Sequence, residues 1–267
     1  MFTVAVANRK GGVGKSSVAT NLAAALALAG KRVLLIDMDS QASASAILLD
    51  ELPADAQTTA HVLVGQCTLA DAIRPSTREH LFVVPASRDL TAAQLGIVSK
   101  TGRETILRRA MRGLADFDIA IIDTAPEQQL ATVNSLVAAT HVLMPFTPDP
   151  KALEGLRTTS EAVAEIASAE LAQVSVLGCV QVVHDRRLGV TEQARDQVKA
   201  AYGDSLFETR IRANSSFIVC PAWHRDIFAI EQAERAPRRG SEDYRALATE
   251  VASRLGWKET SRAQVAS

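Results

Sequence analysis

Short, almost wholly apolar runs recur along the chain, and segments with helical spacing lie between them. The apolar runs are FTVAVA at 2–7, VLLID at 33–37, LFVVP at 81–85, DIAIID at 118–123, HVLMPF at 141–146 and VSVLGCVQVV at 174–183. The helical segments that we expect between them include 16–29, 104–114, 129–138 and 152–167. Near-continuous apolar strands that alternate with helices are typical of a parallel sheet covered on both faces. The pattern therefore predicts an α/β fold with a mostly parallel twisted sheet.

The last predicted helix extends from 242 to 257, where Tyr244, Leu247, Ala248, Val251 and Leu255 recur at helical spacing. Its charges are nearly balanced, so we expect it to pack on the rest of the protein and not to lie on a membrane, which favours a more basic helix. No linker, repeat or low-complexity block interrupts the chain. We predict a single domain over 1–257, followed by a polar tail at 258–267 that frays.

Composition narrows the class of protein. The 267 residues have a net charge of −1, which gives no global electrostatic reason to bind nucleic acid or membrane. The residues before the first apolar run are not basic, so this is not the pattern of a signal peptide. The two long uncharged runs, 16–30 and 128–148, contain too many polar residues for a membrane span. We expect a soluble, cytoplasmic protein.

The three cysteines, Cys67, Cys179 and Cys220, are far apart and form no CxxC pair. Their spacing indicates neither a zinc or iron–sulfur site nor a disulfide framework. We expect three buried thiols in a reducing compartment.

The segment NRKGGVGKSS at 8–17 follows the first apolar run and begins the first helix. That is the context of a Walker A phosphate loop, although Arg9 occupies the place of the first glycine in GxxxxGK[ST]. Backbone N–H groups of such a loop point at phosphate oxygens, and glycine lets the backbone close round the anion. The residues predicted to bind a nucleotide are Gly11, Gly12, Val13, Gly14, Lys15, Ser16 and Ser17.

Three of these residues have specific expected roles. Lys15 is expected to reach the β- and γ-phosphates, Ser16 to bind Mg²⁺ through its hydroxyl, and Ser17 to donate to the α-phosphate. The loop contains a second lysine, Lys10, for which the general motif gives no role. The loop by itself predicts binding of ATP or GTP.

Three aspartates follow the loop in the order that a phosphate-binding protein requires. Asp37 and Asp39 come at the end of the second apolar run, and Asp123 ends the run IAIID. The carboxyl ends of parallel strands are where ligands bind in such sheets. Asp123 matches a Walker B aspartate, whose carboxylate holds Mg²⁺ directly or through water.

These segments resemble the ParA/MinD superfamily of dimeric ATPases. KGGVGKSS looks like its deviant Walker A motif, DMDSQAS like its DxDPQ segment, and IIDTAP like its Walker B and switch II segment. The segment ATHVLMPFTPDPKALEGL at 139–156 is also similar to ParA proteins. The chain most resembles the short, Soj-like ParA partition ATPases, which implies a P-loop NTPase-type fold, ATP and Mg²⁺ as cofactors, and slow, partner-stimulated ATP hydrolysis.

The resemblance also implies roles for individual residues. Lys10 would be the signature lysine, which crosses a nucleotide-sandwich homodimer and contacts the phosphates bound by the other subunit. Asp39 would orient or activate the attacking water, and Asp37 and Asp123 would hold Mg²⁺ through water. The chain departs from the family at Ser40 and Ala125, where prolines are usual. These departures bear on the switch geometry and on coupling to cargo.

ParA-like proteins bind DNA nonspecifically as ATP dimers, release it after partner-stimulated hydrolysis, and so position a plasmid, a chromosome or a protein complex. A ParB-like protein or a cargo adaptor would be the partner, and the protein would be associated with the nucleoid. Nonspecific DNA binding needs arginine or lysine on one face. We single out Arg187 and Arg212 from the following candidates: Arg186, Arg187, Arg210, Arg212, Arg225, Arg235, Arg238 and Arg239.

Two alternative functions stay open. One is a MinD-like ATPase that positions proteins at a membrane surface, and the other is a nucleotide-gated binding module without hydrolysis. Other relatives of the superfamily match less well. The chain lacks the cluster cysteines of a nitrogenase iron protein, the tyrosine-rich tail of a tyrosine kinase and the substrate loop of a ligase such as dethiobiotin synthetase.

Overall fold

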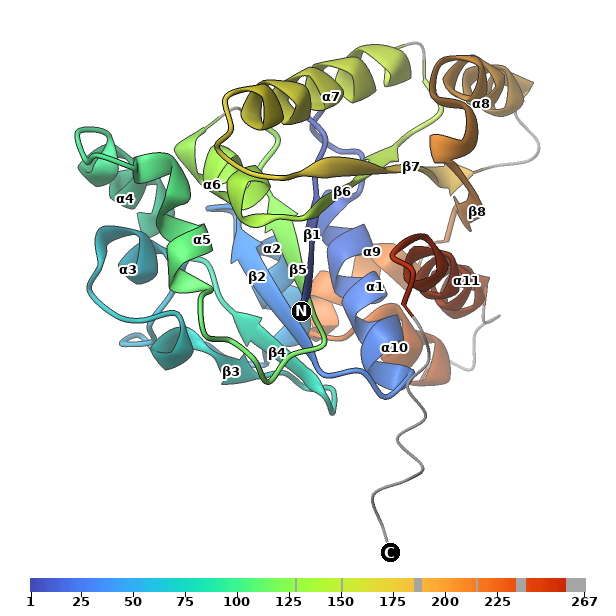
Figure 1. Cartoon of the computed structure of the whole chain (residues 1–267). Coiled ribbons are helices and arrows are strands. Elements are labelled where there is room, and N and C mark those ends of the chain that lie inside the picture. The colour runs from blue at the N-terminus through green and yellow to red at the C-terminus, as the bar shows by residue number, and fades with distance from the viewer. Residues whose placement is uncertain (128, 150, 185–188, 215, 234–238, 258–267) are drawn as a thin grey trace, which may run out of the picture.

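Within the residues that the computed structural model describes (1–127, 129–149, 151–184, 189–214, 216–233 and 239–257), eight strands form one sheet (Figure 1). The strands are β1 (Phe2–Val6), β2 (Val33–Met38), β3 (Arg74–Pro75), β4 (Leu81–Val84), β5 (Ile119–Thr124), β6 (His141–Phe146), β7 (Ser175–His184) and β8 (Leu206–Arg212). Their order across the sheet is β3-β4-β2-β5-β1-β6-β7-β8. Only the short edge strand β3 pairs antiparallel in this part of the chain. The predicted mostly parallel sheet is confirmed.

Helices cover both faces of the sheet. They are α1 (Lys15–Leu28), α2 (Ser43–Leu48), α3 (Thr59–Val64), α4 (Asp89–Ile97), α5 (Ile106–Ala110), α6 (Leu130–Ala138), α7 (Ala152–Ser168), α8 (Gly189–Tyr202), α9 (Ser216–Trp223), α10 (Ile227–Ala233) and α11 (Arg239–Arg254), with 3₁₀ turns at Ala70–Ala72, Arg103–Thr105 and Gly203–Ser205.

Two clusters of buried apolar side chains lie on the two faces of the sheet. Val33 and Leu35 of β2 belong to the cluster that includes side chains of α1, α2, α10 and α11, whereas Leu34 and Ile36 belong to the cluster that includes side chains of the helices from α3 to α8. Successive side chains of a strand point to opposite faces, so a strand buried on both sides must be apolar throughout. That is why the apolar runs located six of the strands within one or two residues.

The differences from the predicted elements have local causes. The helix predicted over 104–114 is a 3₁₀ turn followed by the short α5, and the left-handed backbone of Gly113 (φ 91°) follows it. The edge strand β8 was not among the predicted strands because LFETRIR is only partly buried and its charged residues interrupt the apolar run. Cys179 and Cys220 are buried as predicted, but Cys67 is only partly buried because it lies in the loop after α3.

The last helix, α11, packs on the protein as predicted, although it begins and ends about three residues earlier than the sequence indicated. Tyr244, Leu247 and Val251 are completely buried and belong to the cluster that contains α1. Among the described residues, no helix is both long and apolar enough to cross a membrane. The predicted frayed tail at 258–267 lies outside the described residues.

The topology decides where a site can form. The central strand β1 has β5 and β6 as its neighbours, and β2 lies on the far side of β5. All four strands run in the same direction, so the loops that follow them meet at one edge of the sheet. The predicted phosphate loop follows β1, Asp37 and Asp123 lie near the ends of β2 and β5, and Asp39 directly follows β2, so all of them come to this edge.

Candidate nucleotide site

The predicted phosphate loop connects β1 to α1. Gly12 (φ 74°) and Gly14 (φ 81°) have left-handed backbone conformations, which glycine adopts without the steric cost that other residues incur. A Cβ on Gly14 would also lie 3.2 Å from Cγ1 of Val182. Helix α1 begins directly afterwards, at Lys15, and has no acidic residue in its first turn. The loop therefore presents free N–H groups and the positive end of a 14-residue helix, which is the arrangement that binds phosphate.

The two lysines of the loop have different surroundings. Lys15 is 7% exposed, and its Nζ donates to the carbonyl of Lys10 at 3.3 Å, inside the loop. Burial lowers the pKa of Lys15, and the charges of Asp123 and Asp39 oppose that effect. The side chain of Lys10 is 32% exposed and forms an ion pair with Asp149, in the segment between β6 and α7.

Asp37 and Asp123 lie side by side, paired in register on β2 and β5, and both are completely buried. Asp37 accepts hydrogen bonds from the N–H of Ser45 (2.9 Å), the hydroxyl of Ser45 (2.7 Å) and the N–H of Asp39 (3.1 Å). Burial raises the pKa of Asp37 to about 6, although the bonds from Ser45 and Asp39 favour the ionised form.

Neither carboxylate oxygen of Asp123 has a hydrogen-bond partner of ordinary geometry among the described residues. Burial and then the charge of Asp37 raise its pKa well above the usual value, while the nearby hydroxyl of Ser16 and the charge of Lys15 act in the opposite direction. Buried oxygens without partners are costly unless a ligand completes them.

The site has the donors that Mg²⁺ prefers. The hydroxyl of Ser16 and the carboxylate of Asp123 are hard oxygen ligands, and Asp123 has lone pairs available. Within the described part of the chain, no group of three or more His, Cys, Asp or Glu side chains could hold a metal alone. Mg²⁺ binds nucleotide sites through one or two protein oxygens, phosphate oxygens and water.

Asp39 lies at the solvent side of this cluster and is only partly buried. Its Oδ1 accepts the N–H of Gln41 at 3.0 Å, and its partly exposed carboxylate marks what we call the mouth of the site. Its charge acts on the pKa values of Lys15, Asp37 and Asp123. The structure thus brings together the predicted lysine of the loop, Ser16 and all three predicted aspartates.

Arg212, one of the two predicted DNA-binding arginines, is not part of this cluster. The guanidinium of Arg212 donates to both carboxylate oxygens of Asp243 and to Glu242, so a DNA phosphate would compete with these bonds. Arg187 lies outside the described residues. Both assignments stay predictions.

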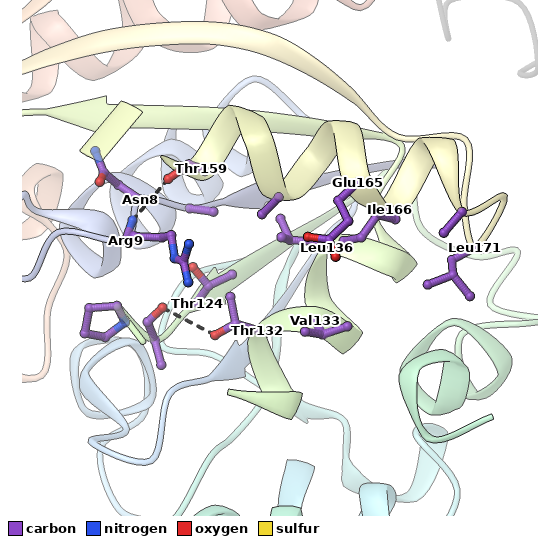
Figure 2. Close-up of a pocket in the computed structure, with 15 residues that line it drawn as sticks. Asn8, Arg9, Thr124, Thr132, Val133, Leu136, Thr159, Glu165, Ile166 and Leu171 are labelled. Atoms are coloured by element: carbon purple, nitrogen blue, oxygen red, sulfur yellow. Dashed lines mark hydrogen bonds between the residues drawn. The ribbon is translucent and has the colours of Figure 1, made fainter. Parts of the chain in front are cut away.

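A pocket of about 150 Å³ lies between α6 and α7, beside the site (Figure 2). Its walls are mostly apolar, and it reaches Asn8 and Arg9 at one end of the phosphate loop and 124–126 after β5. Ala125, where the family usually has proline, contributes to its lining. The residues predicted to bind the nucleotide, 11–17, do not contribute to the lining, so the pocket is separate from the phosphate-binding part of the loop.

Sequence reasoning missed several residues that build the site. Ser45 binds Asp37, Asp149 binds Lys10, and Asn8 and Gly155 support the loop, as described below. Ser45 follows the segment DMDSQAS, whereas Asn8 lies in the phosphate-loop segment and Asp149 and Gly155 lie in 139–156, where no role was predicted for them. Their signal is a contact between segments far apart in the chain, which spacing alone does not reveal.

Comparison with known proteins adds independent information. Residues 1–176 match the family model described as AAA domain. The sporulation initiation inhibitor protein Soj of Bacillus subtilis is 34% identical, over 94% of this chain and 98% of its own. The chromosome partitioning protein ParA of Myxococcus xanthus is 32% identical, over 94% of this chain and 88% of its own.

Solved structures share the fold. The complex of a Cyanothece McdA variant with ATP has a TM-score of 0.83 at 22% identity and covers 97% of this chain and 98% of its own. Cobyrinic acid a,c-diamide synthase from Mycobacterium smegmatis, with a bound ATP analogue and magnesium, has a TM-score of 0.81 at 26% identity, with 97% and 96% covered. The fold alone thus occurs in proteins of different function, whereas sequence identity over nearly the whole chain points to the Soj and ParA proteins.

Proposed function

The chain belongs to the ParA/MinD superfamily of ATPases, and we propose that it is a partition ATPase whose output is ATP-dependent association. In this proposal, ATP binding joins two chains into a nucleotide-sandwich dimer. The dimer binds DNA nonspecifically, and a ParB-like protein or a cargo adaptor stimulates slow hydrolysis that releases it. The cargo is a plasmid, a chromosome or a protein complex, and the protein works in the cytoplasm on the nucleoid.

The observation that supports this proposal most is the different surroundings of the two lysines. Lys15 is buried inside its own loop, where it can reach the phosphates of its own nucleotide. Lys10 projects out of the loop, partly exposed, to Asp149. A cation held at the surface of a phosphate site is available to a nucleotide on another chain, where it would stabilise charge on the transferring phosphoryl group.

ATP and Mg²⁺ are the cofactors in this proposal. The N–H groups of 11–17 and Lys15 hold the phosphates, Ser16 and Asp123 hold the metal, and Asp37 fixes the loop that contains Asp39. Bound Mg²⁺ supplies charge neutralisation at the β- and γ-phosphate oxygens. Asp39, at the mouth of the site, is placed to orient the attacking water.

Light scattering with ATP, with ADP and without nucleotide tests the dimer. We expect the wild-type chain to dimerise with ATP only, and Lys10→Ala to stay monomeric while it still binds a fluorescent ATP analogue. Lys15→Ala should lose binding of the analogue. Lys199→Ala, which removes an exposed lysine of α8, is the matched control and should behave as wild type. Full dimerisation of Lys10→Ala would refute the role of Lys10 in trans.

Measurement of DNA binding across a salt series tests the proposed nonspecific DNA binding of the ATP dimer. We expect binding only with ATP, and an affinity that falls steeply with salt because contacts to phosphates release counterions. ATP-dependent sedimentation with anionic liposomes but not with DNA would instead indicate a MinD-like function. Against that alternative, the apolar face of α11 is already buried in the protein. Absence of phosphate release in a hydrolysis assay would indicate a binding module without hydrolysis.

A further inference from the structure

The first three residues of the phosphate loop, 8–10, which we call the arm, are held mainly by β6 and α7, and the carbonyl of Lys10 also accepts a hydrogen bond from Nζ of Lys15 at the start of α1. Asn8 is 3% exposed, and its Nδ2 donates to the carbonyl of Pro145 in β6 at 2.8 Å. Its Oδ1 accepts the N–H of Lys10 at 2.9 Å. The N–H of Arg9 donates to Oγ1 of Thr159 in α7 at 3.1 Å, as Figure 2 shows. Each arm residue thus has a contact with β6, with α7 or, for the side chain of Lys10, with Asp149 between them.

The arm and α7 approach each other closely at Gly155, the fourth residue of α7. A Cβ on residue 155 would lie 2.7 Å from Oδ1 of Asn8 and 3.2 Å from Cβ of Lys10. The first distance is shorter than the Cβ contacts of folded proteins, so any larger residue would displace Asn8. Glycine normally weakens a helix interior relative to alanine, so a helical glycine at such a contact is explained by the space it leaves.

We propose that Asn8 and Gly155 are positioning residues that set the place of Lys10. Gly155 lets α7 approach the arm, and Asn8 uses that space to bind the backbone of Lys10 to the end of β6. The proposal rests on the function proposed above, because its consequence is the delivery of Lys10 to the nucleotide of a second chain. Residues 11–14 lead directly into α1 and 15–17 form its first turn, so a displaced arm should leave binding of the chain's own nucleotide intact.

The test compares Gly155→Ala with Gly96→Ala. Both glycines lie in helices, and a Cβ on Gly96 would meet only Cγ1 of Val64, at an ordinary 3.9 Å. Both variants gain the same helix propensity, so the clash with Asn8 is what distinguishes them. We expect Gly155→Ala to bind a fluorescent ATP analogue within about 3-fold of wild type, but to weaken ATP-dependent dimerisation at least about 10-fold. Gly96→Ala should match wild type in both measurements.

A double variant separates this contact from a general effect on α7. Serine at position 8 is shorter, yet its hydroxyl can accept the N–H two residues on. In an Asn8→Ser background, we therefore expect Gly155→Ala to weaken dimerisation by less than about 3-fold, a non-additive result that reports direct contact. If Gly155→Ala proves poorly folded by thermal unfolding, Asn8→Ala replaces it, and should lose dimerisation while nucleotide binding remains.

The outcomes distinguish the two proposals. Dimerisation of Gly155→Ala at the wild-type level, or an equal loss in both backgrounds, would overturn the positioning role while the function stands. A parallel loss of nucleotide binding would show that the contact supports the whole loop, and would also overturn it. A wild-type chain that stays monomeric with ATP would refute the proposed function itself, and with it the positioning of Lys10 for a partner.

Discussion

Asp37 and Asp123 are paired in register on neighbouring strands and are equally buried, yet their carboxylates differ in hydrogen bonding. Asp37 accepts three hydrogen bonds, from both donors of Ser45 and from the N–H of Asp39. Asp123 accepts none of ordinary geometry in the described chain. Both pKa values are raised, first of all by burial.

The difference indicates that one aspartate supports the structure of the site and the other is available to bind a ligand. The bonds of Asp37 hold the loop after β2, which contains Asp39, so three of the roughly four lone-pair sites of the Asp37 carboxylate are already used. The lone pairs of Asp123 are available to a ligand, and burial without partners costs stability that bound metal would offset. Both aspartates were predicted to hold Mg²⁺ through water. The hydrogen bonding leaves Asp123 better placed than Asp37 for that role, which the following variants test.

The largest effect should come from Asp123→Asn. The change removes the charge but keeps the shape, so we expect Mg²⁺-dependent ATP hydrolysis to fall about 10²-fold or more. The free energy of unfolding of the nucleotide-free protein should not fall by more than about 1 kcal/mol, because Asp123 accepts no hydrogen bond of ordinary geometry from the described residues and Asn keeps an acceptor for the nearby hydroxyl of Ser16. Phosphate release and urea unfolding measure the two quantities. A large loss of stability would show that Asp123 holds the fold and not the metal.

Asp37→Ala should show the reverse pattern. It leaves the N–H and hydroxyl of Ser45 and the N–H of Asp39 without their acceptor, so we expect a loss of about 2–4 kcal/mol in the free energy of unfolding. Asp50→Ala, which removes an exposed aspartate that pairs with Arg225, is the control and should cost under about 1 kcal/mol. Equal stabilities of the two variants would contradict a structural role for Asp37.

The two aspartates also show which features of the site can be predicted from the sequence. Apolar runs located the parallel strands, and motifs located Asp37 and Asp123, because strand ends and phosphate loops are local features of the chain. The bonding of Asp37 depends on Ser45, whose hydroxyl also accepts the N–H of Ala86, a residue 41 positions away. The ion pair of Lys10 with Asp149 likewise joins segments that only the folded sheet brings together. Such contacts have no period and no spacing, so no pattern in one sequence predicts them.

Ser45→Ala tests the bonded side with a smaller change. The variant removes one bond to Asp37 and the acceptor of the Ala86 N–H, so we expect a loss of about 1–2 kcal/mol in the free energy of unfolding. Ser135→Ala in α6 is the matched control, since the buried hydroxyl of Ser135 donates only to a carbonyl of its own helix, and the loss should be under about 1 kcal/mol. A loss at Ser45 no greater than at Ser135 would mean that the loop after β2 does not depend on this hydroxyl.

The segment after Asp123 is held by a residue distant in sequence, Gln94 of α4. We expect the smallest loss of stability when this residue is changed. Oε1 of Gln94 accepts the N–H of Ala131 at 2.8 Å in the first turn of α6, and its Nε2 donates to Gln129 at 2.9 Å. Gln94→Ala removes this cap, so the free energy of unfolding should fall by about 1 kcal/mol. Gln94→Glu keeps an acceptor at the positive end of α6 and should recover most of that loss. If urea unfolding shows Gln94→Glu to be less stable than Gln94→Ala, the cap is not what Gln94 contributes. The segment after Asp123 would then depend on bonds between residues close to it in sequence, as the segment after Asp37 depends on Ser45.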